Sequence, residues 1–317
     1  MRFVTFLDQQ QTEKIGVVIE EKVVDINKSY QLSLEQKGVN RSQEIADALL
    51  PGTMVSFLKG GEASTEAAKD AVSFALENAD VLEAVSADLT AVSLKAPVTN
   101  PGKILCVGLN YRDHIIEMNR ELPKFPVIFA KFANAVNGPT AEIPLPEVTS
   151  KLDYEAEFAF VIGKQAKNVA KENALEYVAG YTVVNDVTAR DLQRRTLQWL
   201  QGKNLDGSLP MGPWLVTKDE IPNPSTLEIS LTVNGEVRQK SNTENLVFDV
   251  AFLVEFLSNI MTLEPGDVIC TGTPGGVGFA MDPQVFLKEG DVVRVEVEKV
   301  GAIENRVKEV VKGAVLQ

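Results

Sequence analysis

The chain is poor in the residues from which soft metal sites are built. Its 317 residues include one histidine, His114, and two cysteines, Cys106 and Cys270. Zinc sites draw chiefly on Cys and His side chains, so this set disfavours a zinc site, and any metal should be held by oxygen ligands. Each cysteine lies in a short apolar run, where small buried thiols are common. We therefore expect neither a disulfide nor a catalytic thiol.

Positive charge and long apolar runs are also scarce. Lys and Arg number 31 against 44 Asp and Glu, which gives a formal net charge of −13. Such a surface repels polyanions, so nucleic acid is not an expected partner. No apolar stretch approaches the roughly 18 residues of a membrane-spanning helix, so no membrane partner is expected. Residues 1–8 lead directly into strand-like sequence, and we expect a cytoplasmic protein.

The first hundred residues predict a small N-terminal domain. Its expected elements are short strands followed by helices with apolar residues at helical spacing; they cover residues 2–7, 14–20, 22–26, 42–50 and 64–82. The run KAPVTNPGK at 95–103 has the composition of a linker. These patterns predict an α+β cap over residues 1–98 and a larger domain over residues 99–317.

Strand patterns dominate the larger domain. They cover residues 104–109, 127–131, 154–162, 181–185, 214–217, 227–233, 268–271 and 292–297. Asn234-Gly235 between two alternating runs predicts a two-residue hairpin turn. Only two helices are expected, one after Asp186 and one over 248–260, which is too few for the crossovers of a parallel sheet. The predicted class is α+β, with a predominantly antiparallel or mixed β-roll.

Acidic residues alternate with apolar ones in the run DYEAEFAFVI at 153–162. On a strand, residues two apart point to the same face, so Glu155 and Glu157 should project side by side. Like charges at this spacing are tolerated where they face water or where a cation lies between them. This segment alone does not separate a solvated acidic edge strand from a cation site.

A second strand pattern, GYTVVND at 180–186, ends in an acidic residue. The following residues, 187–193, predict a helix on which Asp186, Arg190 and Gln193 share one face. The alternative is an ordinary helix start with Asp186 as its N-cap. Together, Glu155, Glu157 and Asp186 would form an all-oxygen site suited to Mg²⁺ or Mn²⁺, with Ca²⁺ a less natural substitute. Such an ion keeps positions open for a 2-oxo carboxylate.

The lone histidine lies in the run GLNYRDHIIE at 108–117. His114 and Glu117 are three residues apart, so a helical turn would bring the carboxylate beside the imidazole. A histidine with a carboxylate partner is the usual arrangement of a general base. The alternative is an exposed loop histidine without a role.

Two glycine-bearing loops complete the candidate site. The run GKNLDG at 202–207 places Lys203 between glycines, and TGTPGGVG at 271–278 follows an apolar strand. The second run fits neither dinucleotide-binding nor phosphate-loop spacing, so nucleotide binding is not expected. It can still bring backbone N–H groups and the Thr273 hydroxyl close to a small anion.

Taken together, these segments resemble the fumarylacetoacetate hydrolase family. The similarity runs through GLNYRDH, LDYEAEFAFVIGK, GYTVVNDVTARDLQ, GKNLDGSLPMGP, VNGEVRQ and LEPGDVICTGTPGGVG, in the family's order. It implies a homodimer with a mixed β-roll, and a lid over residues 111–122. The implied metal ligands are Glu155, Glu157 and Asp186, and the implied catalytic residues are His114, Glu117 and Lys203. The implied substrate-binding residues are Tyr111, Arg112, Arg190, Gln193, Lys203 and Thr273.

The resemblance, to a bacterial acylpyruvase or fumarylpyruvate hydrolase, favours one reaction class. We expect a Mg²⁺-dependent hydrolase that cleaves a C–C bond in an acylpyruvate such as fumarylpyruvate, fumarylacetoacetate or acetylpyruvate, with water activated by His114. The alternative is decarboxylation of oxaloacetate or isomerisation of a 2-oxo diacid, because these reactions also pass through an enolate. A non-catalytic binding protein is a third hypothesis, against which the intact His114, Glu117 and Lys203 count.

Overall fold

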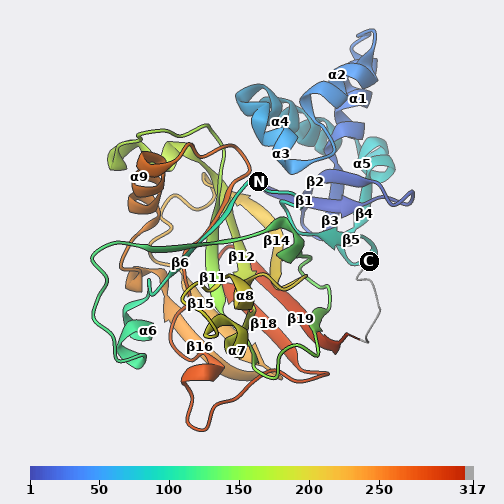
Figure 1. Ribbon diagram of the computed structural model, residues 1–317. Coiled ribbons are helices and arrows are strands. Elements are labelled where there is room, and N and C mark those ends of the chain that lie inside the picture. The colour runs from blue at the N-terminus through green and yellow to red at the C-terminus, as the bar shows by residue number, and fades with distance from the viewer. Residues whose placement is uncertain (311–317) are drawn as a thin grey trace.

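The computed structural model of the protein describes residues 1–310. Figure 1 shows a small N-terminal lobe, in blue, above a larger body rich in strands. The α+β class and the mixed sheets are as predicted: most strand pairs are antiparallel, and three are parallel. Among residues 1–310, no helix has the length and apolar character needed to cross a membrane.

The N-terminal lobe packs helices against a short antiparallel sheet. Its helices are α1 (Ile26–Gln36), α2 (Ser42–Leu49), α3 (Met54–Lys59), α4 (Gly61–Glu77) and α5 (Ala79–Val85). The sequence patterns missed α1 and α3, which begin at side-chain caps: Asp25 accepts from the Lys28 N–H and Thr53 from the Ser56 N–H. The single helix predicted over 64–82 is two helices, because Asn78 has an extended backbone.

A twelve-stranded sheet joins the lobe to the body. Its strands are, in spatial order, β4 (Ser86–Asp88), β3 (Lys22–Asp25), β2 (Glu13–Ile19), β1 (Arg2–Leu7), β14 (Leu209–Thr217), β12 (Val178–Asn185), β11 (Ala156–Ile162), β17 (Val268–Cys270), β6 (Ile104–Gly108) and β7 (Val127–Lys131), with β5 (Ser93–Lys95) beside β1 and β8 (Val136–Asn137) beside β14. Phe3 of the lobe and Val161 of the body belong to one buried cluster. Sheet and core therefore run across the predicted boundary at 98/99, which stays a prediction.

A five-stranded sheet packs against the body's part of the large sheet. Its strands are, in order, β16 (Glu236–Asn242), β15 (Glu228–Val233), β18 (Val292–Val297), β19 (Gly301–Glu309) and β9 (Ile143–Leu145). Alternating apolar and polar residues in β18 give a strand with one buried face. By contrast, every residue of β11 is buried, since this strand lies inside the body. Positive φ at Asn234 and Gly235 confirms the predicted hairpin turn.

The remaining elements are short, apart from helix α9. They are α6 (Arg112–Glu117), β10 (Leu152–Asp153), β13 (Thr188–Ala189), α7 (Arg190–Gln193), α8 (Leu200–Lys203), α9 (Val250–Ile260) and the short 3₁₀ turns at Leu89–Ala91, Ala133–Ala135, Lys171–Tyr177, Thr243–Asn245 and Gly278–Ala280. Helix α9 confirms the prediction over 248–260. Cys106 and Cys270 lie opposite each other on β6 and β17 as free buried thiols, and no disulfide joins them.

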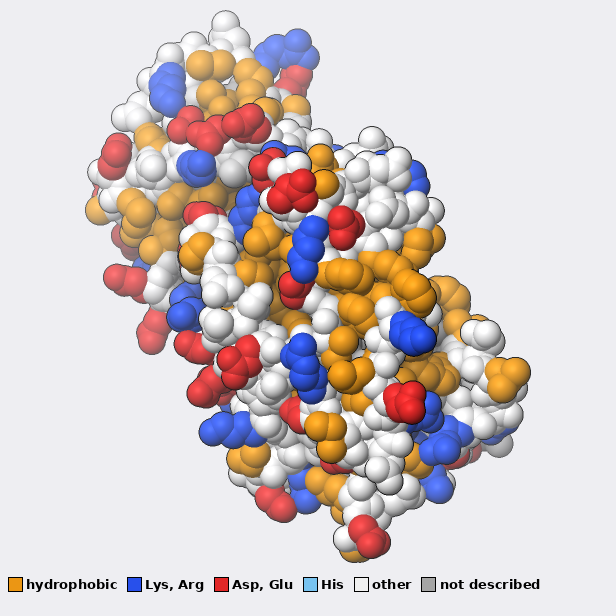
Figure 2. Space-filling view, turned by 90° about the vertical axis from the view of Figure 1, so that its left-hand side faces the viewer, with side chains coloured by type: hydrophobic (Ala, Val, Ile, Leu, Met, Phe, Trp, Pro, Cys, Tyr) orange, Lys and Arg blue, Asp and Glu red, His pale blue; other side chains and the backbone are white. Residues whose placement is uncertain are grey.

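Figure 2 shows that one face of the molecule carries charges of both signs. Lys and Arg side chains are interspersed with Asp and Glu there, and hydrophobic side chains gather across the middle of the larger lobe. The large exposed apolar residues of the body include Ile116, Phe125 and Leu197.

Candidate active site

The segment after Asp186 differs from the predicted helix. It forms strand β13, paired with β10, and only then the single helical turn α7. Val187 and Thr188 favour extended backbone, and the Thr188 hydroxyl donates to the Asp186 carbonyl at 2.8 Å. The predicted helical face and the alternative with Asp186 as N-cap are therefore both wrong. The β10–β13 pairing, not a helix, carries Arg190 to the site.

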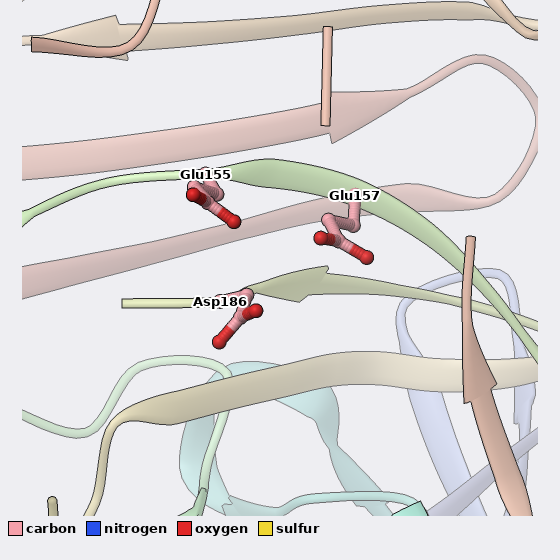
Figure 3. Close-up of side chains that lie close together, drawn as sticks. All are labelled: Glu155, Glu157 and Asp186. Carbon is pink, nitrogen blue, oxygen red and sulfur yellow. The ribbon is translucent and has the colours of Figure 1, made fainter. Parts of the chain in front are cut away.

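Three carboxylates nevertheless converge at the ends of β11 and β12. Glu155 directly precedes β11 and Asp186 directly follows β12, and the Asp186 N–H donates to the Glu155 carbonyl at 2.9 Å. One oxygen each of Glu155, Glu157 and Asp186 lies within 4.8 Å of the others. Figure 3 shows these side chains gathered from two neighbouring chain segments. All three residues are buried, which rules out a solvated acidic edge.

Two cations hold Glu155 in its charged form. The Lys203 ammonium lies 2.7 Å from Glu155 Oε2 and 2.6 Å from Asp186 Oδ2, and the Arg190 guanidinium lies 2.7 Å from Glu155 Oε1. Burial favours the neutral acid, but Lys203 and Arg190 outweigh it and lower the pKa of Glu155 to about 2. Burial likewise opposes the Lys203 charge, yet Asp186 and Glu155 raise the pKa of this ammonium. Lys203 is therefore a fixed cation.

Lys131 is a buried cation that the sequence analysis missed. Its ammonium lies 2.9 Å from Asp186 Oδ1 and donates to the Ser208 hydroxyl and the backbone carbonyls of Ser208 and Lys203. No clear signal in the sequence marks it, because a lysine at the end of the short strand VIFAK has the pattern of a surface residue. Asp186 thus has one lysine on each carboxylate oxygen.

Glu157 has no cationic partner of its own among the described residues. Its Oε2 accepts from the Gly272 N–H at 2.8 Å. Burial, followed by Cys270, Asp186 and Glu155, raises the pKa of Glu157 well above its usual range. A divalent cation between the three carboxylates would favour the ionised form. The donor set, three buried carboxylates with no nitrogen or sulfur ligand, fits a hard ion such as Mg²⁺ or Mn²⁺.

Gly272 can approach Glu157 because it has no side chain. Its φ is +99°, a conformation that L residues rarely adopt, and a Cβ there would lie 2.6 Å from the Val107 carbonyl oxygen. The glycine-rich run at 271–278 therefore supplies a backbone N–H at the carboxylate cluster. In the same loop the Thr273 hydroxyl accepts from Gln239 at 2.9 Å.

The lone histidine lies beside its predicted carboxylate partner. The helical turn α6 places His114 Nδ1 3.3 Å from Glu117 Oε2. Both Glu117 oxygens also accept from the Gly276 N–H, at 2.9 and 3.1 Å, so the pair is joined to the glycine-rich loop. His114 is buried and lines the pocket, which excludes the alternative of an exposed loop histidine.

These groups share one cavity of about 150 Å³. Seven of the residues singled out from the sequence line it: His114, Glu155, Glu157, Arg190, Gln193, Lys203 and Thr273. The sequence analysis missed several further lining residues, namely Met118, Arg120, Phe129, Arg194, Trp199 and Phe279. Apart from Phe129 on β7, these residues lie in loops or single turns, where no strand or helix period indicates which side chains point inward.

Two predicted substrate residues lie elsewhere. Tyr111 is fully buried beside α6 and is not among the lining residues. The Arg112 guanidinium donates to the backbone carbonyls of Glu244 and Leu246, both at 3.2 Å. Glu117 contacts His114, and Asp186 contacts Lys203, but neither carboxylate lines the cavity itself.

Known proteins share this architecture. Residues 103–308 match the family model described as "Fumarylacetoacetate (FAA) hydrolase C-terminal". The mitochondrial oxaloacetate tautomerase fahd2 of Xenopus laevis is 48% identical over 82% of this chain and 80% of its own. A fumarylacetoacetate hydrolase structure from Exiguobacterium antarcticum is 35% identical, with a TM-score of 0.79 over 98% of this chain and 100% of that one.

A further solved structure contains ligands. It is the maleylpyruvate hydrolase of Sphingobium sp. SYK-6 in complex with manganese(II) and pyruvate. That protein is 30% identical to this chain, with a TM-score of 0.72 over 98% of this chain and 99% of that one.

Proposed function

The chain belongs to the fumarylacetoacetate hydrolase family, and on that premise we propose that it catalyses the keto–enol tautomerisation of oxaloacetate. The activity is that named for the Xenopus laevis relative. The observation that carries the proposal is the pairing, in one cavity, of a proton acceptor with a buried fixed cation. His114 with Glu117 is the acceptor, and Lys203 is the cation. Tautomerisation needs both, because a proton leaves C3 while negative charge develops on the 2-oxo oxygen.

Each residue has a defined part in this proposal. His114 takes the C3 proton through Nε2, since Nδ1 faces Glu117. Lys203 and Gln193 donate hydrogen bonds to the 2-oxo oxygen and stabilise the enolate while Lys203 keeps its own proton. The enolate oxygen takes a proton from solvent to give the enol, and His114 returns the C3 proton to solvent. A divalent cation held by Glu155, Glu157 and Asp186 would add a Lewis acid that polarises the 2-oxo carboxylate.

Hydrolysis of an acylpyruvate is the second candidate. It was the reaction expected from the sequence, and the His114–Glu117 pair favours it because the same base can deprotonate water. The maleylpyruvate hydrolase neighbour supports it at the level of the family. The more similar Xenopus laevis relative supports the isomerase alternative instead. We therefore rank tautomerisation above hydrolysis.

A parallel assay tests the order of these candidates. The purified protein is supplied with Mn²⁺ or Mg²⁺, and ketonisation of enol-oxaloacetate is followed by its ultraviolet absorbance. Pyruvate release from fumarylpyruvate, acetylpyruvate and oxaloacetate is measured in parallel. We expect tautomerisation to give the highest kcat/KM. Faster pyruvate release from an acylpyruvate would make the protein a hydrolase, and faster release from oxaloacetate would make it a decarboxylase.

Three further expectations stay predictions. We propose that Mg²⁺ or Mn²⁺ is the resident ion, supported by the carboxylate cluster and by the manganese in the Sphingobium neighbour. A homodimer would sediment as such at micromolar concentration. The cytoplasmic location also stays a prediction, and the Xenopus laevis relative is mitochondrial by name; fractionation of the source cells would distinguish the two locations.

A further inference from the structure

We propose that Arg194, together with Arg120, forms a second anion subsite at the pocket mouth, which selects 2-oxo acids that carry a second carboxylate. This inference rests on the proposed function and specifies the substrate class. Both residues line the cavity that contains the carboxylate cluster. The expected ligand is a short dianion whose 2-oxo carboxylate lies at the cluster and whose distal carboxylate lies between the two guanidinium groups.

Arg194 is held in place by an aromatic ring. Its guanidinium carbon lies 4.8 Å from the centroid of Phe279, and the guanidinium carbon of Arg190 lies 5.9 Å from the same centroid. Phe279 is itself fixed, because its N–H donates to Asp153 Oδ2 at 3.0 Å. Arg190 contacts Glu155 of the carboxylate cluster, so one ring connects the cluster to Arg194.

A chain of side-chain contacts joins the mouth to the carboxylate cluster. Arg190 and Arg194 share one aromatic ring, and Arg190 also touches Glu155, so the mouth and the cluster lie within a few side-chain contacts of each other. The cavity of about 150 Å³ is small. A short diacid is therefore the ligand class that we infer for this subsite.

The guanidinium groups of Arg120 and Arg194 have no salt-bridge partner among the described residues. Within residues 1–310, neither side chain forms a salt bridge or a hydrogen bond to another side chain, whereas Arg190 in the same cavity pairs with Asp153 and Glu155. Two unpaired guanidinium groups at one mouth are unexpected in a chain with a net charge of −13. A guanidinium binds a carboxylate through paired, charge-assisted hydrogen bonds, so a substrate carboxylate would complete this arrangement.

Binding of two matched ligands tests the subsite. Oxaloacetate and 2-oxobutanoate share the 2-oxo acid end and differ by a carboxylate in place of a methyl group. Dissociation constants are measured on the Mn²⁺-saturated protein by stopped-flow quenching of tryptophan fluorescence, since Trp199 lines the cavity. We expect the wild type to bind oxaloacetate at least about tenfold more tightly, as for one charge-assisted contact.

The matched control is the neighbouring arginine. Arg194→Gln should reduce the preference for oxaloacetate by about fivefold or more and leave 2-oxobutanoate binding unchanged. Arg195→Gln removes the same charge from an exposed residue that does not line the cavity, so it should preserve the preference. Equal effects of the two substitutions, or equal weakening of both ligands by Arg194→Gln, would overturn the subsite.

This experiment also separates the subsite from the proposed function. A protein that prefers the dianion but does not tautomerise oxaloacetate retains the subsite and loses the proposed reaction. A protein that tautomerises oxaloacetate but shows no preference between the two ligands retains the reaction and loses the subsite.

Discussion

The floor and the mouth of the pocket differ in how their charges are held. At the floor, Glu155, Asp186, Lys131 and Lys203 are at most 5% exposed and form a continuous ion-pair network. At the mouth, Arg120 and Arg194 are exposed, and the segment after α6 presents apolar side chains to solvent, with Phe125 69% exposed. The difference supports the two proposals made above, in which the floor carries the chemistry and the mouth selects the substrate.

The cost of losing a charge differs between the two regions. A buried charge costs several kcal/mol unless a partner compensates for it, so removing one member of the network leaves the others uncompensated. An exposed guanidinium is already hydrated and contributes little to folding stability. Substitutions at the floor should therefore change stability and activity together, whereas substitutions at the mouth should change activity alone.

The largest effect is expected for Asp186→Ala. This substitution removes a proposed metal ligand and leaves the ammonium groups of Lys131 and Lys203 without their shared carboxylate. We expect activity to fall to background and the free energy of unfolding to drop by about 3–5 kcal/mol. Initial rates measure the loss of activity and chemical denaturation measures the loss of stability, while Mn²⁺ titration tests the loss of the metal ligand. EDTA treatment of the wild type should abolish activity but cause no comparable drop in the free energy of unfolding, because the ion pairs remain.

The control for this prediction is Asp80→Ala, which removes an exposed carboxylate at the start of α5. It should leave both stability and activity within experimental error of the wild type. A stable Asp186→Ala protein with normal Mn²⁺ affinity would mean that the network is neither a metal site nor a structural centre.

A smaller effect, confined to activity, is expected for His114→Ala. Loss of the proposed base should lower kcat for tautomerisation and for acylpyruvate hydrolysis by about 10² to 10⁴. Decarboxylation of oxaloacetate should persist, because that reaction needs no prior proton removal from C3 or from water. Mn²⁺ affinity should stay nearly intact, since His114 is not among the clustered carboxylates. Initial rates for the three reactions in one variant test this separation.

Glu117→Gln should be less harmful than His114→Ala. An amide can still accept from the Gly276 N–H through its carbonyl oxygen, so the loop contact survives while the charge beside His114 is lost. Undiminished tautomerisation in His114→Ala would refute the assigned role of the imidazole, whatever the behaviour of Glu117→Gln.

Lys131→Met tests whether a partner of Asp186 that does not line the cavity supports metal binding. Removing this ammonium frees Asp186 Oδ1 and leaves the Ser208 oxygens without their donor. Partners of metal ligands typically contribute 10- to 100-fold in affinity, so we expect Mn²⁺ binding to weaken by about that factor. Lys124→Met, on an exposed residue, is the control. An unchanged Mn²⁺ dissociation constant would show that Lys131 supports only the local fold.

The sequence predicted the chemistry of the floor better than its geometry. Strand alternation and the all-oxygen donor set correctly grouped Glu155, Glu157 and Asp186. The helix expected after Asp186 is wrong, because the β-branched Val187 and Thr188 favour extended backbone, and helical spacing from a carboxylate does not outweigh that preference. Lys131 escaped notice, because a lysine at the end of a short strand has the pattern of a surface residue.

The mouth was less predictable. Arg120 and Arg194 lie in a loop and at the end of a single turn, and no periodic pattern in the sequence predicts that Arg194 lies over the ring of Phe279. That contact depends on where the fold places Phe279, whose N–H donates to Asp153, far away in the sequence. Such long-range contacts cannot be read from local patterns. Of the N-terminal helices, α1 and α3 escaped prediction for a local reason, since their caps at Asp25 and Thr53 are stronger signals than their weak apolar patterns.

The smallest effect is expected for Arg112→Gln, and it separates similarity in sequence from contact in the fold. The family resemblance implies that Arg112 binds substrate, but its guanidinium donates to the carbonyls of Glu244 and Leu246 outside the cavity lining. Hydrogen bonds of a partly exposed side chain contribute about 1 kcal/mol, so unfolding should become easier by no more than that amount. KM for oxaloacetate should stay within about twofold of the wild type, in contrast to the larger rise expected for Arg194→Gln. Steady-state kinetics on both variants decide between them: a tenfold rise in KM for Arg112→Gln alone would show that this residue, and not Arg194, meets the substrate when the mouth closes.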